Sequence, residues 1–122
     1  MAVRVFTSNP SSLMSSLRLS IATGTVTTWS IDADGDLTHS PEQWRNRAWF
    51  RPRVLDDRII FNILGPKSKT LTRTEYAVFH GRLIEMLLTH FDERFTRATA
   101  TALPAEGDRV TQAKSRITDS RL

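Results

Sequence analysis

The sequence TRTEYAVFHGRLIEMLLTHFDERF, residues 72–95, contains the most regular hydrophobic pattern in the chain. It opens with Thr72 and Glu75, whose spacing is that of a capping box, in which each side chain bonds the backbone N–H of the other at a helix start. Large apolar residues then recur every three or four positions (Tyr76, Phe79, Leu83, Leu87, Phe91). The pattern predicts a helix from residue 73 to about residue 95.

The apolar side of this helix is wider than packing on one sheet requires. At about 100° per residue it spans roughly 200°, whereas an apolar stripe of ~100° suffices to face a core. We therefore expect a second contact surface, formed by Ala77, Gly81, Ile84 and Leu88. Three partners fit it: an N-terminal helix of the same chain, the C-terminal segment, or a second copy of the chain in a homodimer.

Strand patterns precede the helix. Residues 25–31 are rich in β-branched side chains and lead to Asp34-Gly35, a hairpin signal, with residues 36–39 as the returning strand. A second hairpin is expected to join residues 53–55 to residues 58–64. Because residues 58–64 are apolar on both faces, that strand is predicted to be central in the sheet.

These elements predict a small single α+β domain. We expect a curved antiparallel sheet of about four to five strands, built from the two hairpins, with one long C-terminal helix packed on one face. A short helix from Pro41 to about Ala48 is predicted between the hairpins, because Ser40 fits the N-cap and Pro41 the first helical position. Residues 98–103, which alternate alanine and threonine, are expected to add a final edge strand.

The ends of the chain have different compositions. Residues 1–23 are serine-rich and lack acidic side chains, as organellar targeting segments do. Apolar residues at helical spacing, from Leu13 to Ile21, equally fit a short N-terminal helix, so a leader or such a helix is expected there. Residues 24–103 are assigned to the domain and residues 104–122 to a mobile polar tail. Either Met1 or Met14 fits as the working start.

Composition excludes several classes of function. The 122 residues include no cysteine, which excludes disulfides, zinc fingers and cysteine nucleophiles. The longest apolar run is far shorter than the ~20 residues of a membrane span, and a cytoplasmic protein is expected. The net charge is +4, but residues 42–73 alone hold eight basic side chains against three acidic ones, a local net charge of +5.

Aromatic and basic residues alternate within this basic segment. The candidate contact residues are Trp44, Arg45, Arg47, Trp49, Arg51 and Arg53. Tryptophan and arginine are enriched where proteins bind other proteins. The same residue types bind single-stranded nucleic acid through stacking and phosphate contacts. They also fit a structural role, in which the tryptophans fill the core and the arginine stems cover it.

Other motifs are weaker. The carboxylates of Asp32, Asp34 and Asp36 alternate as calcium ligands do, but their glycine and glutamate spacing departs from the EF-hand and a hairpin tip explains them. His80 lies beside Glu75 and Tyr76, without an evident nucleophile. We expect His80 and His90 to be half-buried on the apolar side of their helix. No metal or cofactor is expected.

Three functions follow from these patterns. The leading hypothesis is a non-catalytic interaction module that self-associates or binds another protein through Trp44–Arg53. The alternative is a single-stranded nucleic-acid binding protein that uses the basic segment 42–73. The third is a small enzyme or ligand carrier that uses His80.

Overall fold

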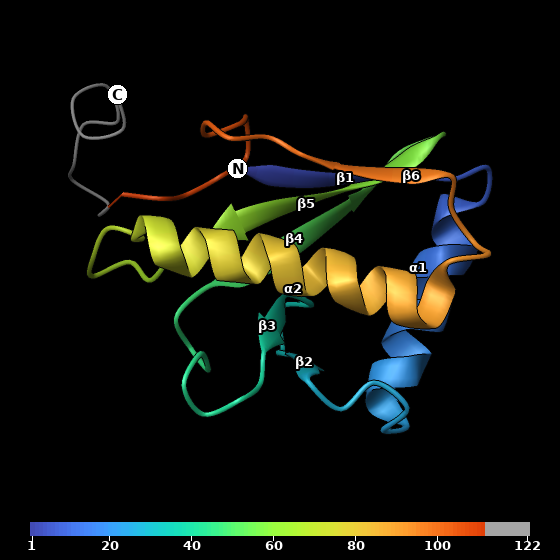
Figure 1. The fold of residues 1–122 in the computed structure, drawn as a ribbon, viewed down its shortest axis with the longest axis horizontal. Helices are drawn as coiled ribbons and strands as arrows, with labels where there is room; N and C mark the ends of the chain where they lie inside the picture. The colour runs from blue at the N-terminus through green and yellow to red at the C-terminus, as the bar shows by residue number, and fades with distance from the viewer. Residues whose placement is uncertain (112–122) are drawn as a thin grey trace.

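In the computed structural model, residues 1–111 are described, and they form an α+β fold of one six-stranded sheet and two helices (Figure 1). No helix in this part of the chain is long and apolar enough to cross a membrane. Along the chain the elements are β1 (Ala2–Phe6), α1 (Pro10–Ala22), β2 (Trp29–Ile31), β3 (Leu37–His39), β4 (Trp49–Val54), β5 (Arg58–Leu64), α2 (Arg73–Phe91) and β6 (Arg97–Ala100).

The sheet has the strand order β2-β3-β4-β5-β1-β6, and every neighbouring pair is antiparallel. It is larger than the four to five strands expected, because β1 lies between β5 and β6. The sequence analysis placed residues 1–23 in a leader or a short helix. The helix is present as α1, but the strand before it was missed, so residues 24–103 do not carry the fold alone.

One face of the sheet carries the hydrophobic core. Alternate residues of β1 and β5, among them Val5 and Phe61, join Phe50 of β4 in a single buried cluster. Leu17 of α1 and Phe79 of α2 belong to the same cluster, so both helices contribute to the core on this face. The intervening residues of the strands point to the opposite face, since side chains alternate along a strand.

The capping box at the start of α2 is confirmed. The Thr72 hydroxyl accepts from the Glu75 N–H at 3.1 Å, and the Glu75 carboxylate accepts from the Thr72 N–H at 2.9 Å. The helix ends at Phe91, four residues before the predicted end. Phe79 and His80 lie against the ring of Phe50, with ring centroids 6.4 and 5.2 Å away. In Figure 1 the helix runs across the sheet on the side nearer the viewer.

Both hairpins are present. Gly35 adopts a φ of 86°, the left-handed conformation that the tip between β2 and β3 requires. The first of these strands is shorter than expected and begins only at Trp29. Strand β5 pairs with β4 on one side and β1 on the other, so its predicted central position is confirmed. Strand β6 forms the sheet edge, as expected for the alanine–threonine segment.

The prediction of a short helix over residues 41–48 is wrong. The chain makes two overlapping turns instead: the Trp44 and Arg45 N–H groups donate to the Pro41 carbonyl, and the Arg47 N–H donates to the Trp44 carbonyl. Asn46 then adopts a φ of 64°, which is left-handed and ends the right-handed turn. The residues between β3 and β4 therefore form a loop.

The polar tail expected from residue 104 is packed where the structure describes it. The Arg109 N–H donates to the Ile63 carbonyl, and the Gly65 N–H donates to the Arg109 carbonyl. Val110 is buried, and the Leu71 N–H donates to its carbonyl. The remainder of the expected tail, residues 112–122, lies outside the described residues.

Candidate functional site

The six contact residues predicted from the sequence do not form one surface. Trp44, Arg45 and Arg47 lie in the loop before β4, where Trp44 is half-buried against the core and the two arginines are exposed. The other three are alternate residues of β4, so Trp49, Arg51 and Arg53 project from the sheet face opposite the core. The segment thus contributes to two different parts of the molecule.

Arg47 has a structural partner. Its guanidinium lies 3.3 Å from the carboxylate of Glu75, the buried residue of the α2 capping box. Burial acts to raise the pKa of Glu75, but the hydrogen bonds from the Thr72 N–H, the Arg47 guanidinium and the Thr72 hydroxyl outweigh it and lower that pKa. Arg47 therefore helps hold the start of α2.

Arg51 also has a partner within the fold. Its guanidinium donates two hydrogen bonds, of 2.9 and 2.8 Å, to the buried carboxylate of Asp36, and this bonding raises the pKa of Arg51. Asp32 accepts from the backbone N–H groups of Asp34 and Asp36, both at 2.9 Å. The three aspartates lie close together, but these bonds are those of a hairpin turn that pairs with an arginine.

Arg53 joins arginines from other strands. In the sheet register Arg53 lies opposite Ile60, and Ile60 lies opposite Arg4 of β1, so the two arginines flank one apolar side chain. Strands are ≈ 4.8 Å apart, which separates the two backbone positions by about 10 Å. Within residues 1–111, neither guanidinium has a carboxylate partner; Arg53 donates to the neutral Asn62 at 3.2 Å.

A second row repeats this arrangement two residues further along the strands. Phe6 of β1 lies between Arg58 of β5 and Arg97 of β6. The Arg97 guanidinium lies 4.0 Å and the Arg58 guanidinium 5.8 Å from the centre of the Phe6 ring, in cation–π positions. We call the surface formed by the two rows the arginine face (Arg4, Phe6, Arg53, Arg58, Ile60, Arg97).

Part of the arginine face is hollowed. The hollow has a volume of ≈ 480 Å³ and is lined by Arg4, Arg53 and Arg58 together with apolar side chains and residues 105–106. Among residues 1–111, Glu106 is the one acidic side chain that lines it. Asp57 pairs with Arg58 at 2.8 Å in an exposed ion pair, which contributes little to stability.

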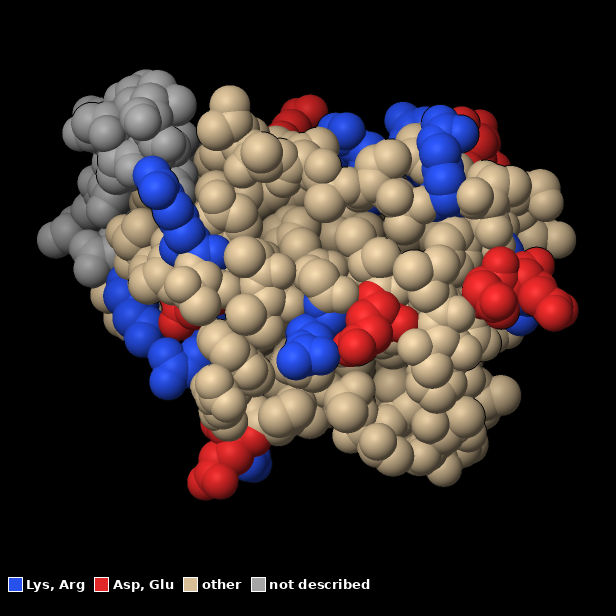
Figure 2. Space-filling view, viewed as in Figure 1, with Lys and Arg blue, Asp and Glu red and all other residues tan. Residues whose placement is uncertain are grey.

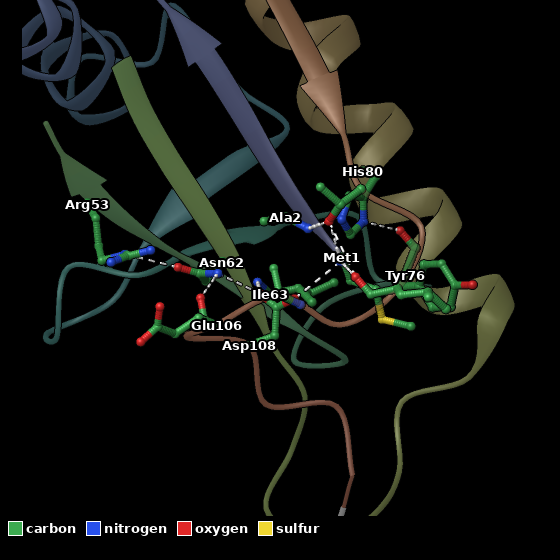
Figure 3. A network of polar contacts seen from close by, with 12 residues as sticks. Met1, Ala2, Arg53, Asn62, Ile63, Tyr76, His80, Glu106 and Asp108 are labelled. Carbon is green, nitrogen blue, oxygen red and sulfur yellow. Dashed lines mark hydrogen bonds and ion pairs between the residues drawn. The ribbon is translucent and has the colours of Figure 1, made fainter. Parts of the chain in front are cut away.

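Residues 105–106 form one wall of this hollow, and Asn62 holds this wall in place (Figure 3). The Asn62 amide donates to the Glu106 carbonyl at 3.0 Å and to the Asp108 carboxylate at 2.7 Å. Asp108 also lies 3.3 Å from the Met1 amino group. Gly107 has a φ of 99°, and a Cβ there would lie 2.7 Å from the Asn62 oxygen, so only glycine fits between the wall and the sheet.

The residues expected to form a dimer surface lie on α2. Ala77 and Gly81 are exposed, Leu88 is 53% exposed, and Ile84 is partly buried against the core. A Cβ added to Gly81 would meet nothing within 4 Å. Figure 2 views the side of the molecule that carries α2 and shows mainly uncharged side chains there. Self-association through this surface stays a prediction.

Two of the three histidines, His39 and His80, are buried. His80 is buried against Phe50, and its Nδ1–H donates to the Tyr76 carbonyl at 2.6 Å. His39 is also buried and donates to the Thr28 carbonyl at 2.9 Å. Burial lowers the pKa of both residues. His90, which we expected on the apolar side of its helix, is exposed.

These lowered pKa values predict an acid-dependent loss of stability. Below a pH of about 6.5 the unfolded chain binds protons at His39 and His80 that the folded chain does not. The free energy of unfolding therefore decreases as the pH is lowered. We expect urea denaturation to show lower stability at pH 5.5 than at pH 7.5. The variant His80→Leu should reduce this difference, and an unchanged difference would show that His80 titrates normally.

Sequence reasoning missed Arg4 and Arg97. They lie far from the basic segment in the chain and reach Arg53 and Arg58 only through the pairing of β1 with β5 and β6. The available signal was the apolar alternation of Ala2–Phe6, which is typical of a strand.

The chain matches no protein-family model, no curated protein and no solved structure.

Proposed function

We propose that the protein is a non-catalytic binding module that binds single-stranded nucleic acid across the arginine face. The observation that carries the proposal is the position of Arg4 and Arg53. Strands from distant parts of the sequence bring these two guanidinium groups to the same hollow, and neither has a carboxylate partner within residues 1–111.

The chemistry of the arginine face suits a phosphate polymer. Guanidinium groups donate paired hydrogen bonds to phosphate oxygens. Phe6, which is partly exposed, lies between Arg58 and Arg97 in the second row, and bases of a single strand stack on arginine planes and aromatic surface. A single strand is favoured over a duplex, because the major groove admits a helix or a two-stranded ribbon rather than the face of a six-stranded sheet.

An acidic protein segment is the competing ligand, since it presents carboxylates to the same arginines. The sequence-based hypothesis of a protein partner at Trp44–Arg53 receives less support, because Arg47 and Arg51 pair with Glu75 and Asp36. Self-association through α2 is compatible with either ligand, because Ala77, Gly81 and Leu88 belong to a helix and not to the arginine face.

The test is a titration of fluorescently labelled single-stranded DNA and RNA followed by anisotropy. We expect sub-micromolar binding at about 50 mM salt. If the protein makes four phosphate contacts on a single strand, raising the salt from about 50 to 200 mM should weaken the affinity by roughly fiftyfold, through counterion release. Absence of binding at the lower salt, or equal competition by an acidic peptide of the same length, would contradict nucleic acid as the ligand.

A further inference from the structure

The hollow of the arginine face differs from the rest of that face in the number of cations it gathers. Arg4 from β1, Arg53 from β4 and Arg58 from β5 line the same ≈ 480 Å³ space. Phe6, Leu55 and Ile60 supply its apolar lining. Arg58 keeps its ion pair with Asp57, so Arg4 and Arg53 supply the two guanidinium charges that have no carboxylate partner within residues 1–111. An internal phosphodiester of a nucleic acid carries one negative charge, which these two charges more than neutralise. A phosphate monoester carries up to two negative charges near pH 7, because its second pKa is about 6.

The hollow is also closed on one side. Ala105 and Glu106 form a wall, and Asn62 fixes this wall through the Glu106 carbonyl and the Asp108 carboxylate. Figure 3 shows Arg53 and Glu106 on either side of the Asn62 amide. A nucleic-acid strand that lies along the two rows of the arginine face meets this wall. It also meets the Glu106 side chain, whose negative charge repels further phosphates. The geometry is thus that of a site where a strand ends.

We propose that this hollow binds the terminal phosphate monoester of a nucleic-acid strand. The Arg4, Arg53 and Arg58 guanidinium groups donate to the terminal phosphate oxygens, and the adjoining nucleotide lies over Phe6. This inference rests on the proposed function, because it assigns the strand end to one part of the arginine face. It goes beyond that function because it names the group that the hollow recognises, a phosphate monoester at the end of the strand.

The experiment compares three oligonucleotides of one sequence: one with a 5′-phosphate, one with a 3′-phosphate and one with hydroxyl groups at both ends. We expect one of the phosphorylated forms to bind about tenfold more tightly than the hydroxyl form at pH 7.5, the effect of one added charge-assisted contact. The preference should shrink at pH 5.5, where the monoester takes up a proton.

Matched variants locate the effect. Arg53→Gln and Arg4→Gln should each abolish the preference for the phosphorylated end. Arg18→Gln removes the same charge from an exposed position on α1 and should keep it. Inorganic phosphate should reduce binding of the phosphorylated form more than binding of the hydroxyl form.

Two results would overturn the inference in different ways. Equal, salt-dependent binding of all three oligonucleotides would exclude a terminal-phosphate site and leave the arginine face as a nucleic-acid surface. Failure of all three to bind would exclude both. A preference that survives in the Arg53→Gln and Arg4→Gln variants would place the terminal phosphate outside the hollow.

Discussion

The double variant Arg4→Glu/Arg53→Glu is expected to bind single-stranded oligonucleotides at least about a hundredfold more weakly than the original protein at about 50 mM salt. Each arginine is assigned one charge-assisted contact to phosphate, worth about 1.5 kcal/mol or more. Two such contacts amount to about 3 kcal/mol, and each 1.4 kcal/mol is a factor of ten in affinity. Reversing the charges adds repulsion to this loss. Anisotropy measures the change.

The matched control is Arg18→Glu/Arg45→Glu, which changes the net charge by the same amount. Arg18 lies on α1 and Arg45 in the loop before β4, and both are exposed. This control should retain most of the affinity. If both double variants lose affinity equally, binding depends on net charge and the arginine face is not the site. Circular dichroism and urea denaturation establish that each variant is folded.

The variant Phe50→Ala is expected to lower the free energy of unfolding by about 3–5 kcal/mol, the usual cost of removing a buried aromatic ring. Phe50 is fully buried in β4 and joins three parts of the fold. Its ring lies 6.1 Å from Trp29 of β2, 6.4 Å from Phe61 of β5 and 6.4 Å from Phe79 of α2. The loss removes a large share of the 5–15 kcal/mol that stabilises a typical domain. Urea denaturation measures it.

Val54→Ala serves as the comparison, because Val54 is in the same strand but 41% exposed near the tip of the β4–β5 hairpin. Its effect should stay within about 0.5 kcal/mol, as for most surface substitutions. A loss at Phe50 no larger than that at Val54 would show that the sheet and α2 do not share one core.

Local signals predicted the elements whose ends are determined by neighbouring residues. The capping box of Thr72 and Glu75 placed the start of α2 correctly, because both of its bonds lie within one turn. The prediction of a hairpin turn at Asp34-Gly35 was also correct, because it depends only on a left-handed residue at the tip. The prediction of a helix over 41–48 was wrong, because one left-handed residue, Asn46, ends a turn whose opening signals are genuine.

The candidate site depended on pairing between distant strands and could be predicted only in part. Arg53 was identified from the aromatic and basic pattern of its own segment. Its neighbours on the arginine face, Arg4 and Arg97, come from β1 and β6, and no periodicity within a segment reports which strands become adjacent. The same limit explains Arg47 and Arg51, whose carboxylate partners lie 28 and 15 residues away.

The most direct test of the central claim is an NMR titration of isotope-labelled protein with an unlabelled single-stranded oligonucleotide. The account predicts that the largest chemical-shift changes fall on the Arg4, Arg53, Arg58 and Arg97 side chains and on the backbone of β1, β4 and β5. Shifts confined to α1 and α2, or to the loop that contains Trp44, would contradict it.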